Sequence, residues 1–204
     1  MKKLLSTLLV STAVFAGAQS VSADQNIVAQ TGADIKVNGT LGVDNTNPGA
    51  TIPPGDPDWI NVTLPTDTIF YNKTSAPAIK APTYDLTNNS GRPVKISVDA
   101  FTGTNTGLPG DFDLNLDVTG PATGNAVATA STSLIAKGAL QTPTNELITL
   151  ANSVDQYVQG DTPVAIGTAV NNKATFTYSG TASQTSALTV NYTLKLKFEA
   201  VGGW

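Results

Sequence analysis

Four oxygen-bearing side chains alternate along the run "DFDLNLD", at Asp111, Asp113, Asn115 and Asp117. Calcium prefers such oxygen ligands, so this run is the first candidate for a metal site. An EF-hand-type loop also needs glycine at its sixth position and glutamate at its twelfth, where this chain has Leu116 and Ala122. The run is therefore a calcium candidate only if a neighbouring loop completes it. The alternative, a solvated face of a strand, is favoured.

Aromatic rings are the second set of candidates, because exposed rings can stack on sugars. Trp59 and Trp204 are the only tryptophans, and Tyr71 adds a smaller ring. Trp59 falls on the less apolar side of the alternating run "WINVTL", which predicts partial exposure. The competing interpretation is a tryptophan that covers one end of the core. Trp59, Tyr71 and Trp204 are the predicted ligand-binding residues.

The residue types that are missing exclude most familiar active sites. The chain has no cysteine and no histidine, which removes disulfides, Ser-His-Asp and Cys-His catalysis, and zinc sites with those ligands. Only Glu146 and Glu199 are glutamates, so a glycosidase pair would have to draw on aspartates. We therefore expect a protein that is not an enzyme and needs no cofactor.

Charge also narrows the choice of partner. The net charge is -4 with 13% charged residues, and the basic residues are scattered. Nucleic-acid binding would need a positive face, so it is not expected.

The first 23 residues have the order of a secretory signal peptide, with a basic start, an apolar run and the small residues Val21-Ser22-Ala23. The apolar run is too short to span a bilayer, so no transmembrane segment is expected after cleavage. Residues 24–55 contain one alternating stretch, "ADIKVNGTLGV", and then a linker rich in proline and glycine. We place a single β-sandwich domain at residues 56–204. These features predict a secreted, extracellular protein.

The rest of the chain alternates with a period of two. The clearest runs are "RPVKISVDAF", "DFDLNLDV" and the C-terminal "SALTVNYTLKLKFEA"; "WINVTL" is shorter, and "DTIFYN", "PTYDLTN", "KATFTYSG" and "NAVATASTSLI" are weaker. One apolar face per run is typical of half-buried antiparallel strands. We predict an all-β fold, an antiparallel β-sandwich of roughly 8–10 strands. One short helix competes with a strand at "NELITLANSVDQYV", where Leu147, Leu150, Val154 and Tyr157 approximate helical spacing.

The segment "YDLTNNSGRPVKISVDAF" joins two of these runs. Asn88, Asn89 and Gly91 tolerate positive φ, and Pro93 fixes the entry to the next strand. This predicts a tight turn between two strands whose apolar residues face the core.

This segment, together with "DWINVTLPTDTIFYN", resembles a module of exported cell-surface β-sandwich proteins of Gram-positive bacteria, in the neighbourhood of the WxL-type surface proteins. The matching features are the strand that ends in Leu64-Pro65-Thr66, the Phe70 strand, and the Leu-x-Asn-Asn-Ser turn before Val-Lys-Ile-Ser-Val. The resemblance implies a Gram-positive surface setting and a β-sandwich. The Trp-x-Leu motif is absent from this sequence, so that family's cell-wall binding is not carried over.

These observations predict a secreted, non-enzymatic surface or extracellular-matrix protein with a structural or adhesive role. Its expected partners are cell-envelope polysaccharide, other surface proteins or further copies of itself. In one variant, the stretch "ADIKVNGTLGV" adds as a strand to a neighbour's sheet edge. The alternative function is a carbohydrate- or cell-wall-binding module.

Overall fold

The computed structural model describes residues 44–121, 127–159, 162–165 and 171–202. Its elements are a 3-10 turn η1 (Pro57–Trp59) and the strands β1 (Val62–Thr63), β2 (Tyr71–Lys73), β3 (Ala76–Lys80), β4 (Tyr84–Asn88), β5 (Val94–Thr102), β6 (Asp113–Pro121), β7 (Val127–Ala136), β8 (Ala139–Leu140), β9 (Glu146–Leu150), β10 (Gln156–Gln159), β11 (Thr162–Ala165), β12 (Lys173–Thr181) and β13 (Thr193–Ala200). The all-β prediction is confirmed. Short strands make the described total larger than the predicted eight to ten.

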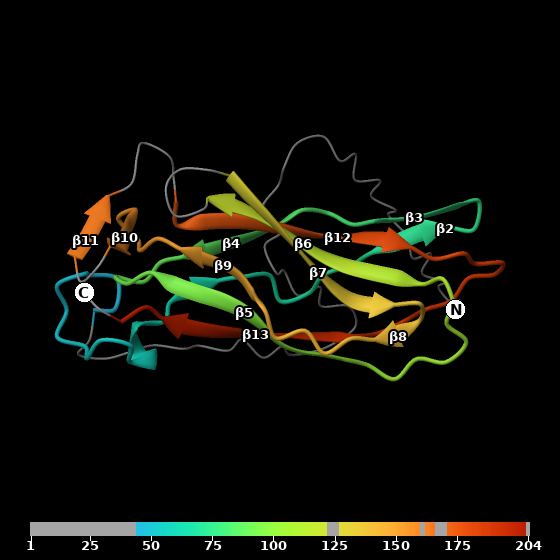
Figure 1. Cartoon of the computed structure of the whole chain (residues 1–204), viewed down its shortest axis with the longest axis horizontal. Helices are drawn as coiled ribbons and strands as arrows, with labels where there is room; N and C mark the ends of the chain where they lie inside the picture. The colour runs from blue at the N-terminus through green and yellow to red at the C-terminus, as the bar shows by residue number, and fades with distance from the viewer. Residues whose placement is uncertain (1–43, 122–126, 160–161, 166–170, 203–204) are drawn as a thin grey trace, which may run out of the picture.

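Two antiparallel sheets form the sandwich (Figure 1). The large sheet has the order β1-β4-β12-β6-β7-β8, and β3 joins the far end of β12 with β2 beside it. The small sheet has the order β13-β5-β9. A separate hairpin, β10-β11, lies at one end. The edge strands of the two described sheets are therefore β1, β2, β8, β9 and β13.

The core lies between the two sheets. It is built from the apolar residues that alternate along β5, β6 and β12. Alternate residues of β6 are buried, as are Phe112 before it and the inward residues of β5 and β12. The inward set is Phe112, Leu114, Leu116, Val118, Val94, Ile96, Val98, Phe176 and Tyr178. Fully burying one such side chain stabilises the fold by about 1.5–3 kcal/mol, so these residues determine the register of both sheets.

Three local predictions were wrong. The run at residues 145–158 forms no helix, because β9 pairs with β5 and buries Leu147, Ile148 and Leu150 there. In "WINVTL", Asp56 caps a 3-10 turn that starts at Pro57, so only Val62–Thr63 remain as strand. The long C-terminal run is a strand only from Thr193 onward, because its partner β5 ends at Thr102.

The segment at Asn88–Pro93 does turn the chain, but it connects the large sheet to the small one. None of its residues has positive φ, which corrects the reason we gave for its composition. Gly91 is needed for space: a Cβ there would lie 2.7 Å from the backbone carbon and oxygen of Asn47. The corner therefore depends on close backbone packing.

Residues 44–55, predicted to belong to a linker, lie against the sandwich. The Gly91 amide donates to the Asn45 carbonyl, the Ser153 hydroxyl donates to the Thr46 carbonyl at 2.9 Å, and Ile52 is buried. The packed domain thus begins no later than Asn45.

Candidate functional site

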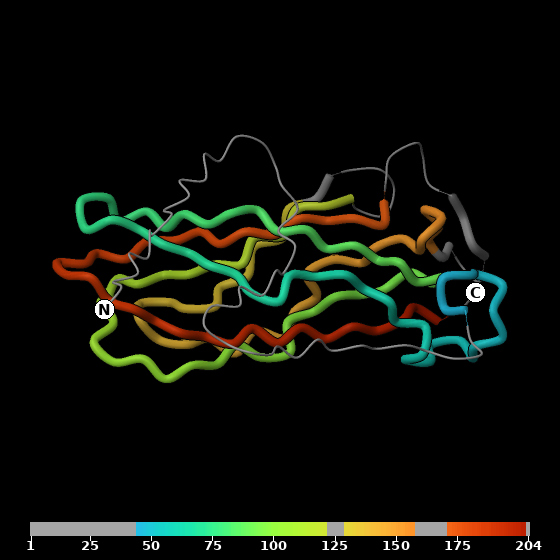
Figure 2. The backbone as a smooth tube through the Cα atoms, turned by 180° about the vertical axis from the view of Figure 1, so that it is seen from behind, coloured from blue at the N-terminus to red at the C-terminus, as the bar shows by residue number. Residues whose placement is uncertain are grey.

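A cavity of about 590 Å³ opens at one end of the sandwich. We call it the end groove. Its walls are two extended segments, residues 67–72 and residues 184–192, and its floor includes Phe101, Phe112 and Tyr178. Figure 2 shows the first wall crossing from the small-sheet side toward the β2-β3 hairpin, with the second wall at the same end of the molecule.

Most of each wall lies outside the strand ladders: the first wall pairs only from Tyr71 onward, where β2 meets β3, and residues 184–192 belong to no described strand. Residues 65–70 and 183–191 make no backbone-to-backbone hydrogen bond with described residues outside their own segment. Side chains hold the walls instead. The Ile69 amide donates to the Tyr84 hydroxyl at 2.7 Å, and Asn105 bonds both the amide and the carbonyl of Asn191 at 3.0 Å. Within the described residues, the backbone groups of residues 65–70 and 183–191 that these side chains do not reach are left without a ladder partner.

Three large apolar side chains on these walls stay in contact with water. Ile69 is 60% exposed, Tyr71 is 52% exposed and Leu188 is 40% exposed. All three line the end groove. Concentrated apolar exposure of this kind marks interaction sites more often than scattered single residues do.

The floor of the end groove is aromatic and rigid. Phe70 lies 6.2 Å from the ring of Phe112 and 6.0 Å from that of Tyr178, and Phe101 stacks on Tyr192 at 4.9 Å. Burial raises the pKa of Tyr178, although its hydroxyl shares a 2.9 Å hydrogen bond with Thr68. Burial also raises the pKa of Tyr192, with Asn105 partly offsetting that shift. These phenols stay neutral at ordinary pH, so the floor offers apolar surface with hydroxyl groups.

The structure does not bring the three predicted ligand-binding residues together. Tyr71 lies on the end groove. Trp59 is fully buried at the other end of the sandwich, where Nε1 donates to the Pro53 carbonyl at 3.0 Å and the Arg92 guanidinium lies 4.5 Å from its ring centre. Of the two interpretations of Trp59, the buried one is correct, because the 3-10 turn points the ring inward. Trp204 lies outside the described residues.

Three of the predicted calcium ligands lie on the outer face of β6 and Asp111 lies two residues before it; each of the three aspartates accepts a hydrogen bond from its own donor. Asp113 accepts from the Lys137 amide at 2.8 Å, Asp117 accepts from the Ser131 hydroxyl at 2.5 Å, and Asp111 accepts from the Ser183 amide at 3.2 Å. The hydrogen bond from Ser183 lowers the pKa of Asp111. Asn115 is half-buried on the same strand. Within the described residues, no three acidic side chains gather closely enough to hold a metal ion.

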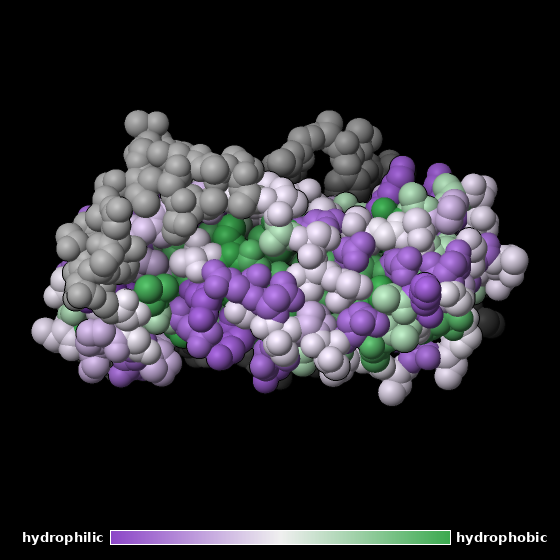
Figure 3. Space-filling model, viewed as in Figure 1, coloured by the Kyte–Doolittle hydropathy of each residue, from purple (hydrophilic) through white to green (hydrophobic). Residues whose placement is uncertain are grey.

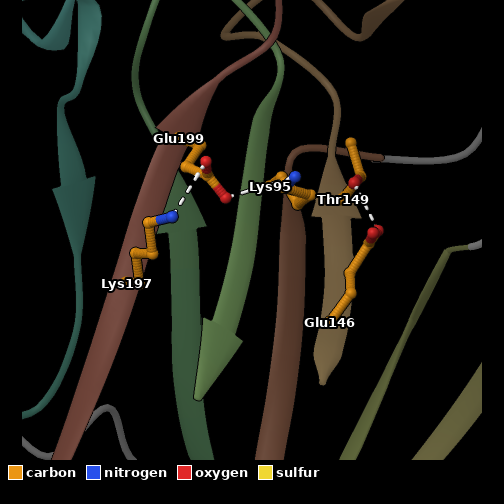
Figure 4. A network of polar contacts seen from close by, with 5 residues as sticks. All are labelled: Lys95, Glu146, Thr149, Lys197 and Glu199. Atoms are coloured by element: carbon orange, nitrogen blue, oxygen red, sulfur yellow. Dashed lines mark hydrogen bonds and ion pairs between the residues drawn. The ribbon is translucent and has the colours of Figure 1, made fainter. Parts of the chain in front are cut away.

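A second polar group lies on the outer face of the small sheet (Figure 4). Glu199 bridges Lys95 at 3.2 Å and Lys197 at 3.0 Å, and Glu146 accepts from the Thr149 hydroxyl at 2.8 Å. The two lysines hold the pKa of Glu199 below its usual value. These side chains are largely exposed, so they form a solvated strand face. In the face that Figure 3 shows, hydrophilic clusters alternate with hydrophobic areas.

The end opposite the end groove is closed by buried polar residues, which we call the asparagine corner: Asn88, Ser90, Arg92, Asn152 and Asn171. Asn88 donates to the carbonyls of Arg92 and Ala151 at 2.9 and 2.7 Å. Its own side-chain oxygen accepts from the Ser90 amide at 3.0 Å. This dense bonding locks the crossing between the sheets.

Sequence reasoning missed Ile69 and Leu188 as groove residues, and Asn105 as the side chain that bonds the second wall. The alternation of "SALTVNYTLKLKFEA" assigned Leu188 to a core face, and no local signal showed that pairing stops at Thr193. Only the length of the partner strand β5 reveals it.

Among the described helical segments, none is long and apolar enough to cross a membrane. Comparison with models of known families, with curated proteins and with solved structures finds no significant match to this chain. The function must therefore be argued from the site itself.

Proposed function

We propose that this chain is a secreted, non-enzymatic surface or extracellular-matrix protein of a Gram-positive bacterium, and that it associates noncovalently through the end groove. The observation that carries the proposal is the end groove itself, whose walls have few ladder partners among the described residues and expose Ile69, Tyr71 and Leu188. A rigid sandwich that leaves apolar surface and strand-like backbone open at one end is suited to holding a partner.

The chemistry of the end groove favours association over catalysis. Its walls and floor are mostly aliphatic, aromatic and amide side chains, and Asp67 is the one carboxylate among the residues that line it. Acid–base hydrolysis of a glycoside would need two carboxyl groups facing each other.

The test compares Ile69→Glu with the control Val154→Glu. Val154 is 53% exposed at the opposite end, so it is matched in size and exposure but lies outside the groove. Retention on a salt-washed Gram-positive cell-wall fraction and self-association by analytical ultracentrifugation are both measured. We expect Ile69→Glu to weaken at least one of them tenfold or more, with no change for Val154→Glu. Equal behaviour of the two variants would remove the end groove as the association site.

A carbohydrate-binding module is the second candidate, because the Tyr71 ring lies exposed at the groove and could stack on a sugar. Tyr71→Ala should then abolish retention on purified peptidoglycan or polysaccharide, while Tyr71→Phe should keep most of it. Loss in Ile69→Glu with full retention in Tyr71→Ala favours the association reading instead.

A further inference from the structure

We propose that the end groove of one copy receives residues 33–43 of a second copy, so that copies join head to tail. This inference rests on the proposed function, because it takes the end groove as the association site. It adds the identity of the occupant and the direction of assembly.

The end groove has the features that an added strand needs. Residues 67–70 of the first wall and residues 184–191 of the second lack ladder partners among the described residues, and the edge of β13 continues directly from the second wall. A peptide lying between the walls could bond to their spare amides and carbonyls. Its apolar side chains would cover Ile69 and Leu188, which water now contacts.

The stretch "ADIKVNGTLGV" has the pattern of such a strand. Ile35, Val37, Leu41 and Val43 share one face, with Gly39 at the centre of that face. The opposite face carries Asp34, Lys36, Asn38 and Thr40. One apolar face fits the aromatic floor, and one polar face would meet solvent. At about 3.3 Å per residue the stretch spans about 35 Å, enough to fill the length of either wall.

The position of Asp44 argues for a second copy. Asn45 and Thr46 are bonded to the asparagine corner and its neighbours, at the end of the sandwich opposite the end groove (Figures 1 and 2). The nine-residue β12 runs between these ends and covers about 30 Å. Residues 33–43 of one copy are therefore about long enough to reach the end groove of that same copy, but not to lie along it as well.

A donor at one end and an acceptor at the other give a contact between unlike surfaces. Such contacts continue from copy to copy unless the rotation closes a ring. The geometry thus predicts linear chains, in which each copy both gives and receives a strand.

The experiment uses the chain from Asp24 onward and separates donor from acceptor. Val37→Asp with Leu41→Asp disables the donor, and Ile69→Glu disables the acceptor, with Leu188→Glu as a second acceptor variant. Val154→Glu is the control. Circular dichroism checks that each is folded, and analytical ultracentrifugation gives the masses.

We expect the unmodified chain and Val154→Glu to grow in mass with concentration. The donor variant alone and the acceptor variant alone should each stay monomeric. An equimolar mixture should stop at a one-to-one dimer, because one intact donor then meets one intact groove. A mixture that stays monomeric, or a donor variant that still assembles, overturns the inference.

Cell-wall retention separates this inference from the proposed function. If Ile69→Glu loses retention while the donor variant keeps it and the unmodified chain stays monomeric, the groove serves another partner and only this inference fails. If Ile69→Glu and Leu188→Glu change neither retention nor mass, both fail.

Discussion

The two ends of the sandwich differ in how their backbone amides and carbonyls are hydrogen-bonded. At the asparagine corner, buried side chains such as Asn88 and Asn152 bond the backbone of crossing segments, and Trp59 seals the surface. At the end groove, two extended segments carry spare backbone groups and exposed apolar side chains. At the first end, side chains of the domain bond the backbone of the crossing segments, whereas at the second much of the wall backbone has no ladder partner among the described residues.

This contrast separates scaffold from site in a chain without histidine or cysteine. Buried asparagines resemble a polar active site in sequence, but when each bond goes to the domain's own backbone they stabilise the fold. Exposed Ile69 and Leu188 resemble ordinary strand residues in sequence, but they are the surface that the fold leaves uncovered. Substitutions at the two ends should therefore differ in which property they change.

The largest effect is expected for Asn88→Ala. The variant leaves the carbonyls of Arg92 and Ala151 without their donor and the Ser90 amide without its acceptor, all in a buried setting. Each unsatisfied buried group costs about 1–3 kcal/mol, so the free energy of unfolding should fall by roughly 3 kcal/mol or more. Urea denaturation measures it. Asn89→Ala, whose side chain bonds only Thr63 at the surface, is the matched control and should change stability by less than about 0.5 kcal/mol. Equal losses would contradict the structural role of the corner.

A pair of glycine substitutions compares the two ends directly. A Cβ at Gly91 would meet the Asn47 backbone at 2.7 Å, and one at Gly103 would meet the Asn191 carbonyl at 2.6 Å. The overlaps are similar, but the backbone of Asn191 is held by one side chain, Asn105. Asn47 follows Asn45 and Thr46, whose carbonyls are bonded to separate segments of the corner. We expect Gly91→Ala to lower the free energy of unfolding by about 1–3 kcal/mol and Gly103→Ala by less. Gly103→Ala should instead weaken association. A larger loss of stability in Gly103→Ala than in Gly91→Ala would contradict the proposed difference between the two ends.

Much of the scaffold could be predicted from the sequence, because period-two alternation depends only on local spacing. Leu114, Leu116 and Val118 were assigned to the core from their alternation and are buried. The turn before Val94 was also found, although its glycine serves close packing and not positive φ.

The site was harder to predict because its cause is non-local. The pairing of β13 with β5 starts at Thr193 because β5 ends at Thr102. Leu188 therefore lies outside the ladder of the small sheet. The burial of Trp59 follows from the Asp56-capped turn, which rotates the ring inward. Of the predicted ligand-binding residues, only Tyr71 reached the groove.

High pH should lower the free energy of unfolding, because buried tyrosines at both ends of the sandwich then lose their protons. Burial raises the pKa of Tyr157, Tyr178 and Tyr192. A tyrosine with a raised folded pKa keeps its proton longer when folded, so its contribution is complete below the unfolded pKa of about 10 and is lost as pH rises through the folded value. Thermal melts from pH 7 to 12 should show a falling midpoint only above about pH 10. In Tyr178→Phe the decline should be shallower. A midpoint that falls between pH 7 and 9 would point to another group.

The smallest change in the free energy of unfolding is expected for a substitution in the end groove, where the change in association is expected to be largest. Ile69→Thr removes apolar atoms that are already 60% exposed, and its backbone bonds to Tyr84 remain. The free energy of unfolding should therefore change by no more than about 0.5 kcal/mol, as is usual for surface positions. Association, measured by ultracentrifugation, should weaken because those atoms lose the cover that a partner provides. A loss of stability as large as that of Asn88→Ala would mean that the wall is held by the domain itself, and the two ends would then not differ in kind.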